Sequence, residues 1–303
     1  MTGRSLTTGR SLTLLVLLLA AAGFLGLVLR VSPGAGSCLP LIGNADCQSA
    51  PIALASGGPG AAAQPTPTPL QLPLDTPSAS QAAQVLPSAG TTFDEEFDGA
   101  GLGAAWGTTW GNFGAATWDR GQSSVANGVL TITAQRNGST WVSDELDTVG
   151  HFSQKYGTFA ARILMPEGPA LWASFFVAQG WQQSATELDV VELCANPPGT
   201  HDGNDGTRLH NVIHLADGTT IAHGTNLDDL MGSWHVYSVA WQPDSLVFSI
   251  DGRPLATETN PARIPNVPMS PALALAVGNW CGTPSDATPS TASMQVDWVR
   301  VTP

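Results

Sequence analysis

The sequence predicts an all-β fold, a single antiparallel β-sandwich built by residues 91–303. Three observations lead to this prediction. Short apolar runs are separated by Gly, Asn, Asp and Pro residues, which are typical of turns. Several runs alternate apolar and polar side chains with a period of two, the pattern of a strand with one buried face. After residue 91, no long run shows the apolar stripe of an amphipathic helix.

About nine such runs follow one another, enough for the two sheets of one sandwich domain. The clearest alternation is in VLTITA at 129–134, where Leu130 and Ile132 share one face and Thr131 shares the other with Thr133. PDS at 243–245 and DGRP at 251–254 are typical of turns between strands. The expected strands lie within residues 128–136, 157–165, 171–179, 187–193, 209–216, 234–242, 245–252, 272–280 and 293–301.

The first 30 residues predict export. Arg4 and Arg10 precede an apolar segment at 12–29, and Arg30 follows it, as in a signal sequence. At roughly 18 residues, the segment lies between a signal-peptide core and a minimal membrane span of ~20 residues. Residues 1–30 are therefore expected to be either a signal peptide or an N-terminal membrane anchor, with the protein secreted or held at the cell surface.

Residues 31–90 are rich in Pro, Gly, Ala and Ser, and residues 56–90 contain no aromatic side chain. A segment of this composition lacks the apolar surface for a core, and its prolines favour extended chain. We expect a disordered linker.

The charge of the chain excludes one class of partner. The net charge is −13, with only 11 Lys and Arg residues. A nucleic-acid surface needs clustered basic side chains, so nucleic acid is not an expected partner. Acidity also disfavours anionic polysaccharides but tolerates neutral sugars.

Four cysteines in an exported chain are able to form disulfides. Cys38 and Cys47 lie near the linker, and Cys194 and Cys281 lie in the predicted sandwich. Pairing within each set is the simplest arrangement, although the sequence allows three connectivities. The spacing does not indicate a zinc site.

Residues 186–194, TELDVVELC, place three carboxylates in an otherwise apolar run. In a regular strand Glu187 and Asp189 share a face, and Glu192 points to the opposite one. One extra residue in a β-bulge would return Glu192 to the first face. The two Glu Cα atoms would then lie ~13 Å apart and their carboxyls ~5 Å apart, close to the spacing in retaining glycosidases of about 5–5.5 Å.

Such a set has a chemical use. One ionised carboxylate attacks an anomeric carbon, while a second carries a proton to the leaving oxygen. A third acid orients the nucleophile. The motif alone also allows two simpler roles for the acids: charge on an exposed strand, or a cation site, because clustered carboxylate oxygens suit calcium.

Several landmarks, in the same order, resemble glycoside hydrolase family 16. ELDVVE matches its E-x-D-x-x-E signature in the bulged, laminarinase-like version. The resemblance extends from about residue 92 to the C-terminus. It implies a β-jelly-roll sandwich of two antiparallel sheets with a concave sugar-binding cleft. It also implies retaining hydrolysis of internal β-glycosidic bonds. The other matching segments are TTFDEEFDG (91–99), KYGTFAARILMPEGPALWASFFVAQ (155–179), WHVYSVAWQPDSLVFSIDGRPL (234–255), ALALAVGNWCG (272–282) and SMQVDWVRV (293–301).

The resemblance assigns roles to the three acids. Glu187 is the expected nucleophile, Asp189 the acid that assists it, and Glu192 the general acid/base. No cofactor is expected for catalysis.

The resemblance also indicates residues around the cleft. Trp172 matches a sugar-stacking position, although a core Trp is the alternative, and Trp280 in GNW is a similar candidate. Phe176 stands where many relatives have a second Trp, and His214 matches the family's cleft His, although a lone strand His is often structural. Asn112 and Tyr156 are weaker candidates for cleft lining.

Two further expectations follow from the matched segments. Asp297 in VDWVRV resembles a ligand of the family's structural calcium, on the face away from the cleft. Cys194 lies two residues beyond Glu192, and Cys281 directly follows Trp280. A Cys194–Cys281 disulfide would tie the catalytic strand to the strand that carries Trp280.

The expected protein is a monomeric, exported, retaining endo-β-glucanase that cleaves internal β-1,3 or mixed β-1,3/1,4 bonds of a neutral glucan. Within the same mechanism, the alternatives are another β-glycan such as a galactan, or transglycosylation. Outside it, the alternative is a non-catalytic glucan-binding module at the cell surface, which would have no need of all three acids.

Overall fold

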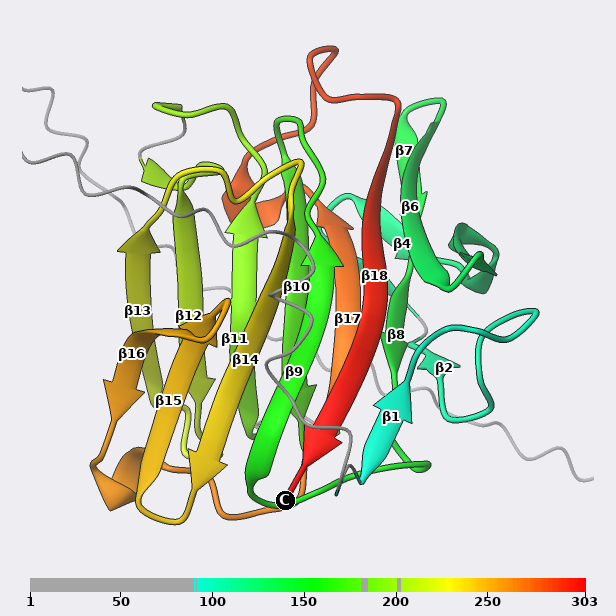
Figure 1. Ribbon diagram of the computed structural model, residues 1–303. Helices are drawn as coiled ribbons and strands as arrows, with labels where there is room; N and C mark the ends of the chain where they lie inside the picture. Colours follow the sequence, from blue (N-terminus) through cyan, green and yellow to red (C-terminus); the bar gives the residue numbers. More distant parts are fainter. Residues whose placement is uncertain (1–89, 91, 110, 181–184, 201–202) are drawn as a thin grey trace, which may run out of the picture. The chain divides into compact units, whose positions relative to one another are not determined.

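The computed structural model describes residues 90, 92–109, 111–180, 185–200 and 203–303 (Figure 1). The predicted N-terminal segment 1–30 and, apart from Gly90, the predicted linker 31–90 lie outside the described residues. So do Cys38 and Cys47. No helix in the described part of the chain is long and apolar enough to cross a membrane.

Strands are the main regular structure of the described chain and form two sheets, and the predicted all-β sandwich is confirmed. The larger sheet has eleven strands in the order β16-β15-β14-β9-β18-β6-β7-β4-β3, with β1 beside β18 and β5 beside β6. Its neighbours are antiparallel except for β4 and β7. Its strands are β1 (Phe93–Glu95), β3 (Asn112–Phe113), β4 (Ala116–Trp118), β5 (Ser123–Ala126), β6 (Val129–Asn137), β7 (Thr140–Ser143), β9 (Gly157–Leu164), β14 (Trp234–Gln242), β15 (Ser245–Ile250), β16 (Arg253–Glu258) and β18 (Thr291–Thr302).

The smaller sheet has seven strands in the order β13-β12-β11-β10-β17-β8-β2, all antiparallel to their neighbours. They are β2 (Gly107–Thr108), β8 (Glu145–Asp147), β10 (Leu171–Ala178), β11 (Glu187–Cys194), β12 (Arg208–His214), β13 (Thr220–Asn226) and β17 (Ser270–Val277). Three short 3₁₀ turns complete the described elements: η1 (Arg120–Gln122), η3 (Pro261–Arg263) and η4 (Asn279–Cys281).

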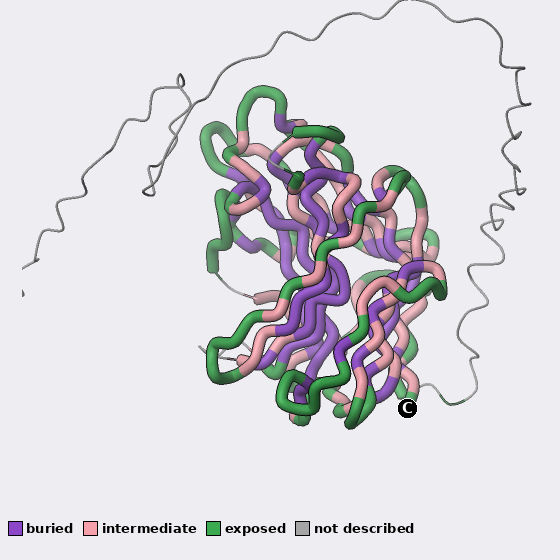
Figure 2. Tube along the Cα trace, turned by 90° about the vertical axis from the view of Figure 1, so that its left-hand side faces the viewer, coloured by how far each residue is buried: buried purple, intermediate pink, exposed green. Residues whose placement is uncertain are grey.

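The core lies between the two sheets, and the alternation in the sequence reflects it. In β6, Leu130, Ile132 and Ala134 are buried, while the residues between them are partly exposed. Figure 2 shows the buried segments concentrated in the strands and the exposed ones in the loops. Every second side chain of a strand thus joins one common core, which explains why a period of two predicts this fold.

Strand β17 departs from this rule because both of its faces are covered. Its Leu273 and Leu275 point into the core between the sheets. On the opposite face, Ala272 and Ala274 form a separate small cluster with Phe176. Small alanine side chains on this outer face leave space above the smaller sheet, and the functional site lies there.

Candidate active site

The three predicted acids lie on β11, and the strand contains the predicted bulge. Against β12, Asp189 pairs with Val212 and Glu192 with His210, so three steps along β11 match two along β12. Against β10, Phe175 pairs with Val191 and Phe176 with Asp189. Val190 is therefore the extra residue, and the bulge returns Glu192 to the face that carries Glu187 and Asp189.

All three acids open into one cavity of about 550 Å³ on the smaller sheet. Its floor includes Ala274 and Ala276, where the small side chains of β17 leave room. Acids of β11 line it together with aromatic side chains from β3, β4 and β10. The lining residues are Thr109, Gly111, Asn112, Phe113, Trp118, Glu145, Trp172, Ser174, Phe176, Glu187, Asp189, Glu192, His214, Ala274, Ala276 and Trp280.

Glu187, Asp189 and His214 form a compact group at one end of the acid row. One potential ligand atom from each lies within 4.8 Å of the others, and His214 Nε2 is 3.2 Å from Asp189 Oδ2. Burial, the charge of Glu187 and a hydrogen bond to Glu187 hold the pKa of Asp189 well above its ordinary value. A protonated Asp189 is therefore able to donate to Glu187, the role expected of an assisting acid.

Burial raises the pKa of Glu187 as well, while the charge of His214 and the hydrogen bond with Asp189 oppose the rise. For Glu192, burial and the neighbouring carboxylates Asp189 and Glu187 raise the pKa to about 9, against the opposing effects of His214 and the Trp172 indole. Glu192 thus holds a proton at neutral pH, as a general acid requires, while Glu187 is favoured as the ionised partner.

A fourth cavity acid, Glu145 on β8, was missed from the sequence. Ser174 on β10 pairs with both Glu192 and Ala274, and Ala274 pairs with Glu145. Glu145 and Glu192 therefore lie in one row across the sheet. Burial, then the charge of Glu187, raise the pKa of Glu145 to about 7. Residues 145–147 read ELD, the same letters that open the catalytic motif, and this repetition was the available signal.

The aromatic residues predicted from the sequence lie where expected. Trp172, Phe176 and Trp280 all line the cavity. The rings of Trp172 and Trp280 meet edge to face at 5.4 Å. Phe113, which the sequence did not single out, packs 5.1 Å from Trp172 and is the one exposed large apolar side chain among the described residues. These rings give the cavity an aromatic wall suited to the flat apolar faces of sugars.

Of the three remaining residues predicted to line the cavity, two do so and one does not. Asn112 and His214 line the cavity, as predicted. Tyr156 does not, and that prediction is wrong. It precedes β9 in the larger sheet, and its ring packs 5.2 Å from Trp241. The sequence placed Tyr156 by its position in the KYG segment, but packing of its large ring against a buried Trp from the core decides its location.

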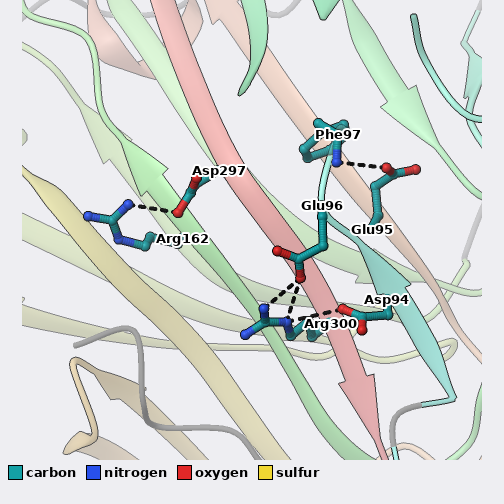
Figure 3. A network of polar contacts seen from close by, with 7 residues as sticks. All are labelled: Asp94, Glu95, Glu96, Phe97, Arg162, Asp297 and Arg300. Atoms are coloured by element: carbon teal, nitrogen blue, oxygen red, sulfur yellow. Dashed lines mark hydrogen bonds and ion pairs between the residues drawn. The ribbon is translucent and has the colours of Figure 1, made fainter. Parts of the chain in front are cut away.

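Asp297, the predicted calcium ligand, is paired with an arginine. Asp297 lies on the larger sheet, and its Oδ2 accepts a 2.7 Å hydrogen bond from the Arg162 guanidinium (Figure 3). The neighbouring carboxylates Asp94 and Glu96 are paired with Arg300. Each of these acids already has a cation, so no set of free carboxylates is gathered for a metal among these described residues. The calcium ligand at Asp297 stays a prediction.

Among the described residues, the one group with the geometry of a metal site is Glu187, Asp189 and His214. Two carboxylates and an imidazole suit a divalent transition metal. A metal there would occupy Glu187, for which the family resemblance implies the role of nucleophile, so we interpret the group as part of the proposed catalytic site.

The expected Cys194–Cys281 disulfide is confirmed. It joins the end of β11 to η4, which carries Trp280. Asn196 strengthens the same junction: its side chain accepts from Ala170 N and donates to the carbonyls of Asn204 and Cys281. The aromatic wall is therefore fixed to the catalytic strand by a covalent bond and by a buried amide.

Comparison with known proteins agrees with the geometry. The model of glycosyl hydrolases family 16 matches residues 112–300, more than half of the chain. The chain belongs to glycosyl hydrolases family 16. Two endo-1,3-1,4-beta-glycanases of Rhizobium meliloti (strain 1021), EglC and ExsH, are 32% and 31% identical to this family 16 chain over 191 residues. Each alignment covers 58% of this chain and 38% of the relative, so the chain matches less than half of their length.

Solved structures show the family 16 fold. The laminarinase from Flavobacterium sp. UMI-01 superposes with a TM-score of 0.62 at 22% identity, covering 70% of this chain and 100% of that one. The Bacillus licheniformis beta-glucanase gives a TM-score of 0.60 at 22% identity, covering 72% and 100%. The family's jelly-roll sandwich is thus confirmed for the described domain.

Proposed function

We propose that this family 16 domain is a retaining endo-β-glucanase that cleaves internal β-1,3 or mixed β-1,3/1,4 bonds. The observation that carries the proposal is the bulged strand β11, which aims Glu187, Asp189 and Glu192 into one cavity. Relatives named endo-1,3-1,4-beta-glycanase and glucan endo-1,3-beta-glucosidase support the substrate class.

In the first step, the Glu187 carboxylate attacks the anomeric carbon while Glu192 protonates the departing glycosidic oxygen. This forms a covalent glycosyl–enzyme ester and releases the sugar on the leaving side. In the second step, the ionised Glu192 takes a proton from water, and that water displaces Glu187. Asp189 donates its hydrogen bond to Glu187, which steadies the nucleophile and stabilises it when it departs.

The cavity favours a neutral sugar over a charged one. Its lining includes four carboxyl groups and no Lys or Arg among the described residues, so an anionic polysaccharide would meet the ionised Glu187 without a Lys or Arg to bind it. The aromatic wall offers stacking, and the carboxyls and Asn112 offer hydrogen bonds to sugar hydroxyls. Both features suit β-glucan.

We also propose that the protein works outside the cytoplasm, secreted or held by its N-terminal apolar segment. The Cys194–Cys281 disulfide supports this location, because such bonds persist in oxidising compartments.

The test is reducing-sugar release from laminarin, lichenan, agarose and galactan by the wild type and by Glu187→Gln. We expect release from laminarin or lichenan and at least a ~1,000-fold loss in the variant, since the covalent step is removed. Release from galactan or agarose, but not from laminarin or lichenan, would show that the substrate is another β-glycan and not a glucan. Equal activity of the two proteins would overturn the mechanism.

A further inference from the structure

The catalytic bulge leaves one backbone carbonyl in need of a partner. Val190 is the extra residue on β11, so its backbone falls outside the regular ladder between the two strands. Val190 and Val191 are both buried in the core between the sheets. A buried carbonyl without a hydrogen bond destabilises the conformation that contains it, so something has to hold the bulge in place.

Asn211 supplies that hydrogen bond. Its Nδ2 donates to the Val190 carbonyl oxygen at 2.6 Å. Asn211 is the residue of β12 between Val212, which pairs with Asp189, and His210, which pairs with Glu192. It therefore stands opposite the bulge, and its side chain replaces the ladder hydrogen bond that the extra residue cannot make.

Packing alone does not account for an amide at this position. Asn211 is 1% exposed, and its neighbours on the same face of β12, Leu209 and Ile213, belong to the apolar core. Its Oδ1 has no hydrogen-bond partner among the described residues. The bond to Val190 is thus the one polar contact of the side chain that the described structure contains, and a buried amide is costly unless such a bond is needed.

We infer that Asn211 is a positioning residue for Glu192: by clamping the Val190 carbonyl, it holds the bulge in the register that turns the acid/base carboxyl toward the substrate. The inference rests on the proposed function. A register slip of one residue moves side chains to the other face of a strand, so a looser bulge would let Glu192 leave the cavity without moving Glu187 or Asp189. The clamp lies on the far side of β11 from the sugar and touches no substrate.

The test compares Asn211→Ala with Leu209→Ala, a control that removes core volume from the same face of β12 without touching the Val190 carbonyl. A displacement of about 1 Å at a catalytic group costs roughly 100-fold in rate. We expect a loss of that order in kcat on laminarin for Asn211→Ala, with KM within about twofold. Leu209→Ala should lower the melting temperature but retain most of its kcat.

A second substrate separates positioning of the acid from general damage. A 2,4-dinitrophenyl β-laminaribioside has a leaving group that departs without a proton. We expect Asn211→Ala to release the first equivalent of dinitrophenol almost as fast as the wild type, with a much smaller loss than on laminarin. An equal loss on the two substrates would overturn the inference.

Asn211→Asp provides a conservative rescue, which also serves if Asn211→Ala does not fold. A protonated Asp has the same shape and donates to the Val190 carbonyl, whereas an ionised one repels it. Activity relative to wild type should be high at acidic pH and collapse as this buried carboxyl ionises. A pH profile identical to the wild type would contradict the clamp.

Failure of the proposed function would look different. If the wild type released no sugar from any polysaccharide, the glucanase proposal would fall while the clamp remained measurable. A ¹³C NMR titration of Glu192 would then decide: its pKa, raised by burial, should fall toward the ordinary value in Asn211→Ala. An unchanged titration of Glu192 would overturn the inference without reference to activity.

Discussion

The protein has two groups of acidic side chains, one on each sheet, and they differ in whether the acids are paired with arginines. On the larger sheet, Asp297 is paired with Arg162, and Arg300 binds both Asp94 and Glu96 (Figure 3). These arginines also lie over Trp rings, Arg162 over Trp234 and Arg300 over Trp298. On the smaller sheet, four carboxyls line one cavity, and His214 is its only basic side chain among the described residues.

The difference appears in their protonation. Burial and mutual repulsion raise the pKa of Glu145 to about 7 and that of Glu192 to about 9. On the larger sheet, burial also raises the pKa of Glu96, but Arg300 opposes the rise. Acids with arginine partners hold strands together, whereas crowding without such partners raises the pKa of the cavity acids, enough for Glu192 to carry a proton at neutral pH.

The largest expected effect separates the two groups by activity. Glu192→Gln should lower turnover of laminarin by roughly 10²- to 10⁴-fold, because proton transfer to the leaving oxygen is lost. Asp297→Asn, an equally small change on the other sheet, should leave turnover within about twofold of the wild type, since Asp297 does not line the cavity and surface ion pairs contribute little to stability. Steady-state kinetics of both variants on laminarin measures the contrast.

The wild-type pH profile sharpens the same prediction. Activity needs Glu187 ionised and Glu192 protonated, so kcat/KM should fall at acid pH and again as pH rises through the pKa of Glu192, about 9 in the free enzyme. If Asp297→Asn lost activity as strongly as Glu192→Gln, the division between the two groups would be wrong.

The disulfide ranks next. It closes a sequence separation of 87 residues, and loss of such a bond typically costs about 2–4 kcal/mol. Cys194→Ser combined with Cys281→Ser should lower the free energy of unfolding by that amount and raise KM, because Trp280 is no longer fixed to β11. Urea unfolding and kinetics measure the two effects. An unchanged KM would show that η4 needs no covalent tie.

Glu145→Gln should stabilise the protein in a pH-dependent way. The folded state binds the Glu145 proton more tightly than the unfolded chain does, because the pKa rises from 4.5 to about 7 on folding. Stability therefore falls as pH rises through this range. The variant should melt a few degrees higher than wild type at pH 8 and at the same temperature at pH 4, in calorimetry. If the variant and the wild type had the same melting temperature at pH 8 as well as at pH 4, the raised pKa of Glu145 would be contradicted.

The smallest effect is expected from Arg300→Gln. Its partners are partly exposed, so loss of the pairs should cost about 1 kcal/mol or less. The alkaline limb of the pH profile should stay where it is, because the cavity acids are not in contact with Arg300. A shift of the alkaline limb in Arg300→Gln would mean that the charges on the larger sheet affect the pKa of the cavity acids.

The sequence predicted the features that depend on local patterns. Alternation in β6 identified a strand with one buried face, and the odd spacing of Glu187 and Glu192 required the bulge. The spacing did not show that Val190, rather than Val191, is the extra residue, because that depends on the register with β10 and β12.

What the sequence missed depends on contacts between distant segments. Glu145 joins the cavity only because β8 and β10 flank β17. Tyr156 was placed by its position in a matched segment, but its ring packs against Trp241 on the larger sheet, far from it in the sequence. Asn211 gave no signal at all, since its importance comes from one backbone carbonyl on the neighbouring strand.

The central claim is that Glu187 and Glu192 on one bulged strand cleave glucan by double displacement. Proton NMR of the reducing end formed in the first minutes of laminarin hydrolysis tests it most directly. Two inversions at the anomeric carbon should give the β-anomer first, followed by slow mutarotation to the α-anomer. Initial appearance of the α-anomer would mean a single displacement by water and would contradict the account.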